Sequence, residues 1–156
     1  MKTFIEYIKQ LKENVVIPPE NEEQQPLKSI KEIQPLIPIL VSKAQNAYDN
    51  WEQDDQGYDH EYGAGGICHT IAEEIASVLN DHGIDAITVS ASIGTQHVYT
   101  IAKFEEGVYE IDIHPNTYET GAAYTWKKIP NVKFDNDDIV IDKIDSDPES
   151  FDNYME

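Results

Sequence analysis

The chain has 156 residues, of which 30 are acidic and 11 are basic, so its formal net charge is −19 at pH 7. Every basic residue is a lysine, although arginine is the side chain that best recognises phosphates and base edges. Polyanions repel such a chain, which excludes nucleic acids and anionic membranes as expected partners. The single cysteine also excludes an internal disulfide.

Two helical regions are predicted in the N-terminal third of the chain. Residues 3–13 place apolar side chains at helical spacing, and a pair of prolines followed by a polar linker ends this helix. A second helical region begins at Ser29, where two further prolines restrict the regular part to residues 38–52. Residues 53–66 are polar and contain glycines, which predicts a loop.

The only cysteine, Cys68, opens the next predicted helix. Residues 68–79 carry an apolar stripe at helical spacing, and Gly83 is typical of the position just beyond a helix end. A helix N-terminus stabilises a thiolate, which is the nucleophilic form of cysteine. The preceding Gly65 and Gly66 would let another chain approach closely, and the backbone N–H of Cys68 could stabilise an oxyanion there.

Five later segments are rich in β-branched and aromatic residues, which predicts strands. They are residues 86–91, 97–103, 108–113, 132–134 and 139–144. The last residues, 145–156, are acidic and are predicted to form a loose tail.

A cysteine nucleophile needs a base, and the base needs a group that orients it. His97 opens one predicted strand, and Asp112 lies near the end of the next. A four-residue connection at residues 104–107 would pair Tyr99 with Asp112. His97 and Asp112 would then be diagonal neighbours on one face of the sheet, within reach of each other. A slip of the pairing by one residue would separate them.

The order of these three residues resembles that of transglutaminase-like proteins, a branch of the papain-like cysteine-enzyme superfamily. Residues 66–68 (Gly-Ile-Cys), 96–99 (Gln-His-Val-Tyr) and 109–115 (Tyr-Glu-Ile-Asp-Ile-His-Pro) carry the resemblance. The separations of 29 and then 15 residues between cysteine, histidine and aspartate are also similar to that family. The resemblance covers residues 51–115, which is less than half of the chain.

The resemblance implies an α+β fold in which N-terminal helices and a cysteine-bearing helix pack on an antiparallel sheet, as in the papain-like core. It also implies acyl transfer from an amide or peptide bond through a thioester, as in a peptidase, a deamidase or a transglutaminase. Cys68 would be the nucleophile, His97 the proton carrier and Asp112 the group that orients it. This chemistry needs no cofactor and no metal, and the acidity of the chain favours a neutral or basic protein or peptide substrate.

Six further residues are candidates for the oxyanion hole or the substrate groove. They are Trp51, Gln56, Gly66, Gln96, Tyr99 and Trp126. Trp51 and Gln56 lie upstream of the cysteine, where members of this superfamily often carry the side chain that completes the oxyanion hole.

The expected organisation is a helix and linker at residues 1–28, the cysteine-enzyme domain at 29–144, and the acidic tail at 145–156. Neither a signal peptide nor a transmembrane segment is predicted. A cytoplasmic location is therefore expected, with a virion or secretion by another route left open.

Three other interpretations stay open at this point. Cys68 lies on an apolar stripe and could be a buried structural residue. A metal could bind Cys68, His69, His97, Asp112 and His114, although the paired spacing typical of a zinc site is missing. The chain could also be a catalytically inactive acidic protein on the same fold, which engages a basic surface of a partner.

Overall fold

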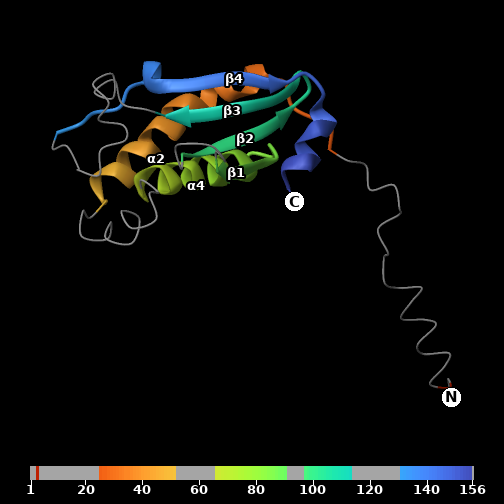
Figure 1. Ribbon diagram of the computed structural model, residues 1–156, viewed down its shortest axis with the longest axis horizontal. Helices are drawn as coiled ribbons and strands as arrows, with labels where there is room; N and C mark the ends of the chain where they lie inside the picture. Colours follow the sequence, from red (N-terminus) through yellow and green to blue (C-terminus); the bar gives the residue numbers. More distant parts are fainter. Residues whose placement is uncertain (1–2, 4–24, 52–65, 91–96, 114–130, 156) are drawn as a thin grey trace.

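The computed structural model describes residues 3, 25–51, 66–90, 97–113 and 131–155 (Figure 1). Its elements are the 3-10 helix η1 (Ile30–Leu36), the helices α2 (Ile37–Asp49) and α4 (Gly66–Asp81), the strands β1 (Ala86–Ser90), β2 (Val98–Phe104) and β3 (Gly107–Ile113), the 3-10 helix η5 (Asn136–Asp138), the strand β4 (Ile139–Asp145) and the 3-10 helix η6 (Pro148–Tyr154). The α+β class is therefore confirmed, whereas the papain-like core stays a prediction. The helix predicted at residues 3–13 lies outside the described residues, except for Thr3.

The helical region after Ser29 divides into η1 and α2, because two prolines interrupt the backbone hydrogen bonding of a continuous helix. Pro35 lies inside η1, and Pro38 lies in the first turn of α2, where a missing backbone N–H is tolerated. Helix α2 ends at Asp49, three residues before the predicted end of the regular part. None of the helices in the described part of the chain is both long and apolar enough to cross a membrane.

Helix α4 follows the apolar stripe that the sequence predicted. The buried residues of this stripe are Ile71, Ala72, Ile75 and Leu79. The helix is longer than predicted by two residues at each end. Beyond it, Gly83 has a φ of 76°, the left-handed conformation that glycine adopts without strain after a helix.

The four strands form one antiparallel sheet in the order β1-β2-β3-β4. Strand β2 pairs with β3 so that Thr100 faces Ile111 and Phe104 faces Gly107. This is the predicted register, and Gly107 has a φ of 140° at the hairpin turn. A Cβ atom on Gly107 would overlap the backbone carbonyl oxygen of Asp145, so the turn requires glycine for space as well as for conformation.

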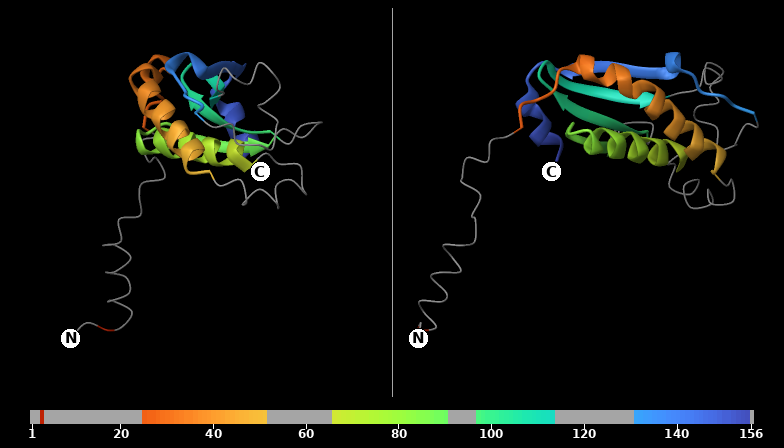
Figure 2. Two further views of the ribbon diagram at one scale, coloured as in Figure 1. Left: turned by 90° about the vertical axis from the view of Figure 1, so that its left-hand side faces the viewer. Right: turned by 180° about the vertical axis from the view of Figure 1, so that it is seen from behind.

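Helices α2 and α4 cover one face of the sheet, as the view from behind shows (Figure 2). Alternation along the strands directs Ala102 and Phe104 of β2, and Ile111 and Ile113 of β3, into the core beneath these helices. On the opposite face a smaller cluster joins Ile101, Val108 and Phe151. The Gly66 end of α4 lies at one end of the sheet, and the β2–β3 turn and η6 lie at the other end (Figure 1).

The strand predicted at residues 132–134 is wrong. This segment runs without pairing to a strand, and Val132 is buried against the core. The side chain of Gln45 on α2 satisfies its backbone, because the amide nitrogen donates to the Val132 carbonyl at 3.0 Å and the amide oxygen accepts from the Phe134 N–H at 2.7 Å. The segment therefore needs no neighbouring strand.

The loose tail predicted at residues 145–156 is also wrong for most of its length. Asp145 ends β4, and η6 follows directly. Asp147 caps η6 by accepting from the Glu149 N–H at 3.0 Å, and Pro148 occupies its first turn. Phe151 is buried and packs against Ile101 and Val108. Burial of this aromatic side chain offsets the entropy of ordering an acidic segment.

Candidate active site

Cys68 lies in the first turn of α4, where the backbone N–H groups have no acceptor within the helix. Its neighbours Ile67 and Ile71 are buried, whereas Cys68 itself is only partly buried. The interpretation of Cys68 as a buried structural residue requires a thiol sealed in the core. The thiol is not sealed there. The partial positive charge of the helix N-terminus favours a negative charge at this position.

His97 and Asp112 are in direct contact, as the predicted register requires. The ring nitrogen Nε2 of His97 lies 2.5 Å from Oδ2 of Asp112, and the carboxylate is only 2% exposed. The other oxygen, Oδ1, accepts from the backbone N–H of Ile113 at 2.9 Å. With both oxygens engaged, the carboxylate has a fixed orientation and in turn fixes the plane of the imidazole.

These contacts raise the pKa of His97 to about 10, well above its ordinary value of 6.5. The largest cause is the hydrogen bond to Asp112, followed by a hydrogen bond to Cys68, while burial acts in the opposite direction. Because Nε2 is engaged by Asp112, Nδ1 is the ring nitrogen left for the sulfur. The imidazole is thus protonated at neutral pH and joins a thiol to a buried carboxylate.

Such an arrangement has the parts that nucleophilic catalysis needs: a nucleophile, a proton carrier and an orienting anion. The charged imidazole is hydrogen-bonded to Cys68, the candidate nucleophile. It can also supply a proton to a leaving amine, because that proton is already on the ring. Asp112 keeps the ring charged and oriented without taking up the proton itself.

Tyr99 is the candidate lining residue that the structure brings closest to this pair. Its ring stacks on the His97 ring with the centroids 6.0 Å apart and the planes at 22°. Burial raises the pKa of Tyr99, and the negative charge of Glu110 adds to this effect. The tyrosine therefore stays neutral and limits the positions that the imidazole ring can take.

Two other candidate lining residues, Trp51 and Gly66, lie in the described part of the chain. Trp51 follows α2 and packs beside Tyr48, with the ring centroids 5.8 Å apart. Gly66 is the first residue of α4, which agrees with its expected place before the cysteine. Three further candidates lie outside the described residues; they are Gln56, Gln96 and Trp126.

The described residues contain no group of three or more histidine, cysteine, aspartate or glutamate side chains that could hold a metal ion. His69, one of the alternative ligands, is exposed and contacts another exposed side chain: its Nε2 lies 2.9 Å from Oε1 of Glu73. His114, another alternative ligand, lies outside the described residues. Within the described chain, His97 contacts both Asp112 and Cys68 and so joins the three residues.

The sequence pattern did not single out Thr100, which is fully buried near the site. Its hydroxyl donates to the backbone carbonyl of Ala72 on α4 at 2.7 Å. The signal available in the sequence was a threonine at a core-facing position of a strand, between Val98 and Ala102. A buried hydroxyl requires a partner, so such a position predicts a specific contact.

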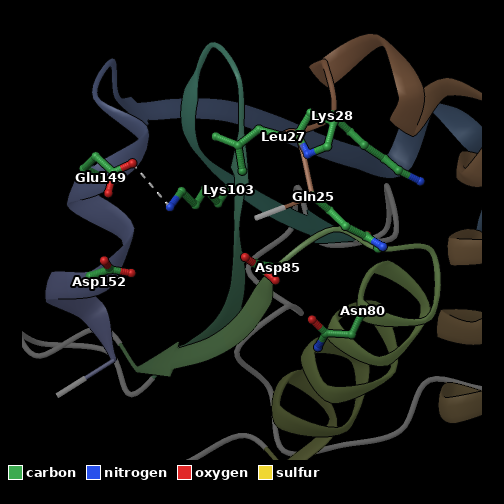
Figure 3. Close-up of a pocket in the computed structure, with 10 residues that line it drawn as sticks. Gln25, Leu27, Lys28, Asn80, Asp85, Lys103, Glu149 and Asp152 are labelled. Atoms are coloured by element: carbon green, nitrogen blue, oxygen red, sulfur yellow. Dashed lines mark ion pairs between the residues drawn. The ribbon is translucent and has the colours of Figure 1, made fainter. Parts of the chain in front are cut away.

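A polar cavity of about 490 Å³ lies at the other end of the fold (Figure 3). Asn80 at the C-terminal end of α4 lines it, together with Asp85, and the ion pair between Lys103 and Glu149, at 3.7 Å, crosses it. Cys68 occupies the opposite end of α4, and a helix of 16 residues is about 24 Å long. This cavity is therefore not the substrate groove of the cysteine.

Comparison with protein-family models, with curated proteins and with solved structures found none that matches this chain. The resemblance to transglutaminase-like proteins thus rests on the chain's own residues. Its three motif residues are separated by up to 44 positions in the sequence, and the fold joins them through His97.

Proposed function

We propose that the protein is a cysteine-dependent acyl-transfer enzyme that acts on an amide or peptide bond through a thioester. The observation that carries this proposal is the position of His97, which is hydrogen-bonded to Asp112 on one side and to Cys68 on the other. A lone structural cysteine needs neither a charged imidazole nor a buried carboxylate behind that imidazole.

In the first step the Cys68 thiolate attacks the carbonyl carbon of the substrate. A carbon–sulfur bond forms, and the oxygen takes the negative charge of a tetrahedral intermediate. The backbone N–H groups in the first turn of α4, which have no acceptor within the helix itself, are suitable donors to this oxygen. His97 then gives its proton to the amide nitrogen, and the carbon–nitrogen bond breaks. The amine departs, and the acyl group remains on Cys68 as a thioester.

In the second step a nucleophile resolves the thioester. Water or an amine attacks the thioester carbon, and His97, now neutral, takes a proton from that nucleophile. The carbon–sulfur bond breaks with its electron pair returning to sulfur, which regenerates the ion pair. Water gives a carboxylic acid, as in a peptidase or deamidase, and an amine gives a new amide, as in a transglutaminase.

The charge of the chain favours a neutral or basic protein or peptide as substrate. The segment between Lys43 and Lys103 contains Cys68 and His97, ten acidic residues and not one lysine. An acidic substrate would be repelled from this segment, whereas a basic one would be attracted at low ionic strength.

The test makes two measurements on separate samples. One is the rate of thiol alkylation, and the other is hydrolysis or amine exchange of glutamine-containing and lysine-containing peptides. The proposal expects Cys68→Ala to abolish turnover and His97→Ala to slow alkylation at neutral pH, with both variants folded. Slow alkylation that is the same in the parent chain and in His97→Ala would overturn it. Salt-sensitive binding to a basic partner that survives Cys68→Ala, without turnover by the parent chain, would instead support the acidic binding protein.

A further inference from the structure

A polar contact joins helix α4 to strand β2 inside the core, close to the candidate triad. The Thr100 hydroxyl donates to the Ala72 carbonyl oxygen at 2.7 Å, and both residues are fully buried. Ala72 lies four residues, or about one helical turn, after Cys68, and Thr100 lies three residues after His97. The contact therefore links the helix that carries the nucleophile to the strand that begins immediately after the base, His97.

Apolar packing alone leaves the position of α4 along the sheet weakly specified. The buried stripe of α4 is made of aliphatic side chains such as Ile71 and Ile75, and their attraction to the sheet has no preferred direction. A hydrogen bond does have a preferred distance and angle. If α4 slid along the sheet, the buried Thr100 hydroxyl would lose its partner, so this contact fixes the first turns of α4 on β2. The last turn is fixed on β1 by the two hydrogen bonds between Asn80 and Ala86.

The helix itself does not need this bond. A carbonyl inside an α-helix already accepts from the N–H four residues later, and its second lone pair is free for another donor. The Thr100 hydroxyl therefore adds nothing to the formation of α4. What it adds is a fixed distance between the first turns of α4 and the start of β2.

We propose that Thr100 is a positioning residue, which sets the location of Cys68 relative to His97 through its hydrogen bond to the Ala72 carbonyl. This inference rests on the proposed function, because it assigns Thr100 to the same reaction. A displacement of about 1 Å between reacting groups is enough to lower a rate by roughly a hundredfold. The bond acts on the chemistry through the helix and touches neither substrate nor reacting atoms.

The experiment compares three variants of the full chain. Thr100→Val keeps the shape and removes the donor, Thr100→Ser keeps the donor, and Thr88→Val is the matched control. Thr88 on β1 is the direct cross-strand partner of Thr100. The substitution Thr88→Val therefore makes the same chemical change on the neighbouring strand. The two readouts are the pH dependence of Cys68 alkylation by iodoacetamide and the NMR titration of the His97 ring.

The proposal expects Thr100→Val to slow alkylation at pH 7 roughly tenfold or more and to move the His97 titration towards its ordinary range. Thr100→Ser and Thr88→Val should behave like the parent chain in both readouts. The proposal is overturned if Thr100→Val leaves both readouts unchanged, or if Thr100→Ser changes them as much as Thr100→Val does. If Thr100→Val does not fold, Thr100→Ala replaces it, and failure of both to fold assigns the bond to stability and overturns the proposal.

The two proposals fail in different ways. If the parent chain turns over no amide substrate while Thr100→Val still changes alkylation and the His97 titration, the positioning role stands and the acyl-transfer function fails. If the parent chain is active and Thr100→Val matches it in rate and in both readouts, the positioning role alone fails.

Discussion

The two ends of the β2–β3 hairpin each hold a carboxylate that accepts hydrogen bonds through both of its oxygens, yet the two carboxylates have different effects. At the open end, Asp112 is buried and bonds to the His97 ring and the Ile113 N–H. At the turn, Glu106 lies nearer the surface and accepts from the Ser29 hydroxyl at 2.6 Å and the Ile30 N–H at 2.8 Å.

The partners and the solvent decide the difference between these carboxylates. Glu106 meets fixed donors at the start of η1, and these bonds lower its own pKa, the Ser29 hydroxyl contributing most. Asp112 is buried and meets a titratable ring, and its hydrogen bond to that ring is the largest cause that raises the pKa of His97 to about 10. The same chemical group therefore anchors the chain at one end and prepares a proton for transfer at the other.

The largest effect is expected when the charge of Asp112 is removed. In Asp112→Asn the amide can still contact the ring but no longer stabilises its charged form, so the pKa of His97 should fall well below 10, towards its ordinary range. Amide turnover should drop by about 10³-fold to 10⁴-fold. NMR titration and steady-state kinetics measure the two effects. An unchanged His97 titration would remove Asp112 from the proposed triad.

A large structural effect is expected at the turn from Gly107→Ala. Gly107 has a φ of 140°, and an added Cβ would overlap the backbone of Asp145. We expect a loss of about 3 kcal/mol in the free energy of unfolding, measured by urea denaturation. The matched control is Gly83→Ala, where φ is also positive, at 76°, but the nearest atom to the added Cβ is 3.6 Å away. It should lose only about 1 kcal/mol, and equal losses would contradict the steric argument.

The raised pKa of His97 predicts how stability depends on pH. Because the folded-state pKa lies above the unfolded value, the stabilisation is fully present below about pH 6.5 and is lost as the pH rises towards about 10. We expect a loss of roughly 2 kcal/mol, less than the whole shift corresponds to, since the ring is partly exposed. Urea denaturation from pH 6 to 10 measures it.

The control for this pH dependence is a histidine that makes only an exposed contact. His97→Ala should abolish the decline, whereas His69→Ala should retain it, because His69 and its partner Glu73 are both exposed. A decline of the same size in both variants would mean that another group causes it.

The smallest effect is expected from Glu106→Gln. The lowered pKa of Glu106 means that its stabilisation is present above its unfolded pKa, near 4.5, and is lost as the pH falls below that value. The neutral amide keeps one acceptor, and the carboxylate is solvated, so the loss at pH 7 should be about 0.5 kcal/mol. Turnover and the His97 titration should not change. A change in either would show that the two ends of the hairpin are coupled.

Much of the framework that holds the candidate site could be predicted from short-range patterns. The apolar stripe from Ile71 to Leu79 predicted α4, and the short turn before Gly107 predicted the register that brings His97 to Asp112. These predictions succeed because helical spacing and hairpin length act over a few residues. The strand at residues 132–134 failed because the polar partner of this segment, Gln45, lies more than 80 residues earlier in the chain.

The sequence by itself determined which side chains share a face, where the turns fall, and therefore that the imidazole just before β2 meets a carboxylate on β3. Only the tertiary structure decided the burial of Asp112, the packing of Phe151 that orders the acidic C-terminal segment, and the contact from Thr100 to Ala72. The reason is physical. Local patterns fix the directions of side chains along one element, whereas burial and contacts between elements depend on which distant element packs against it.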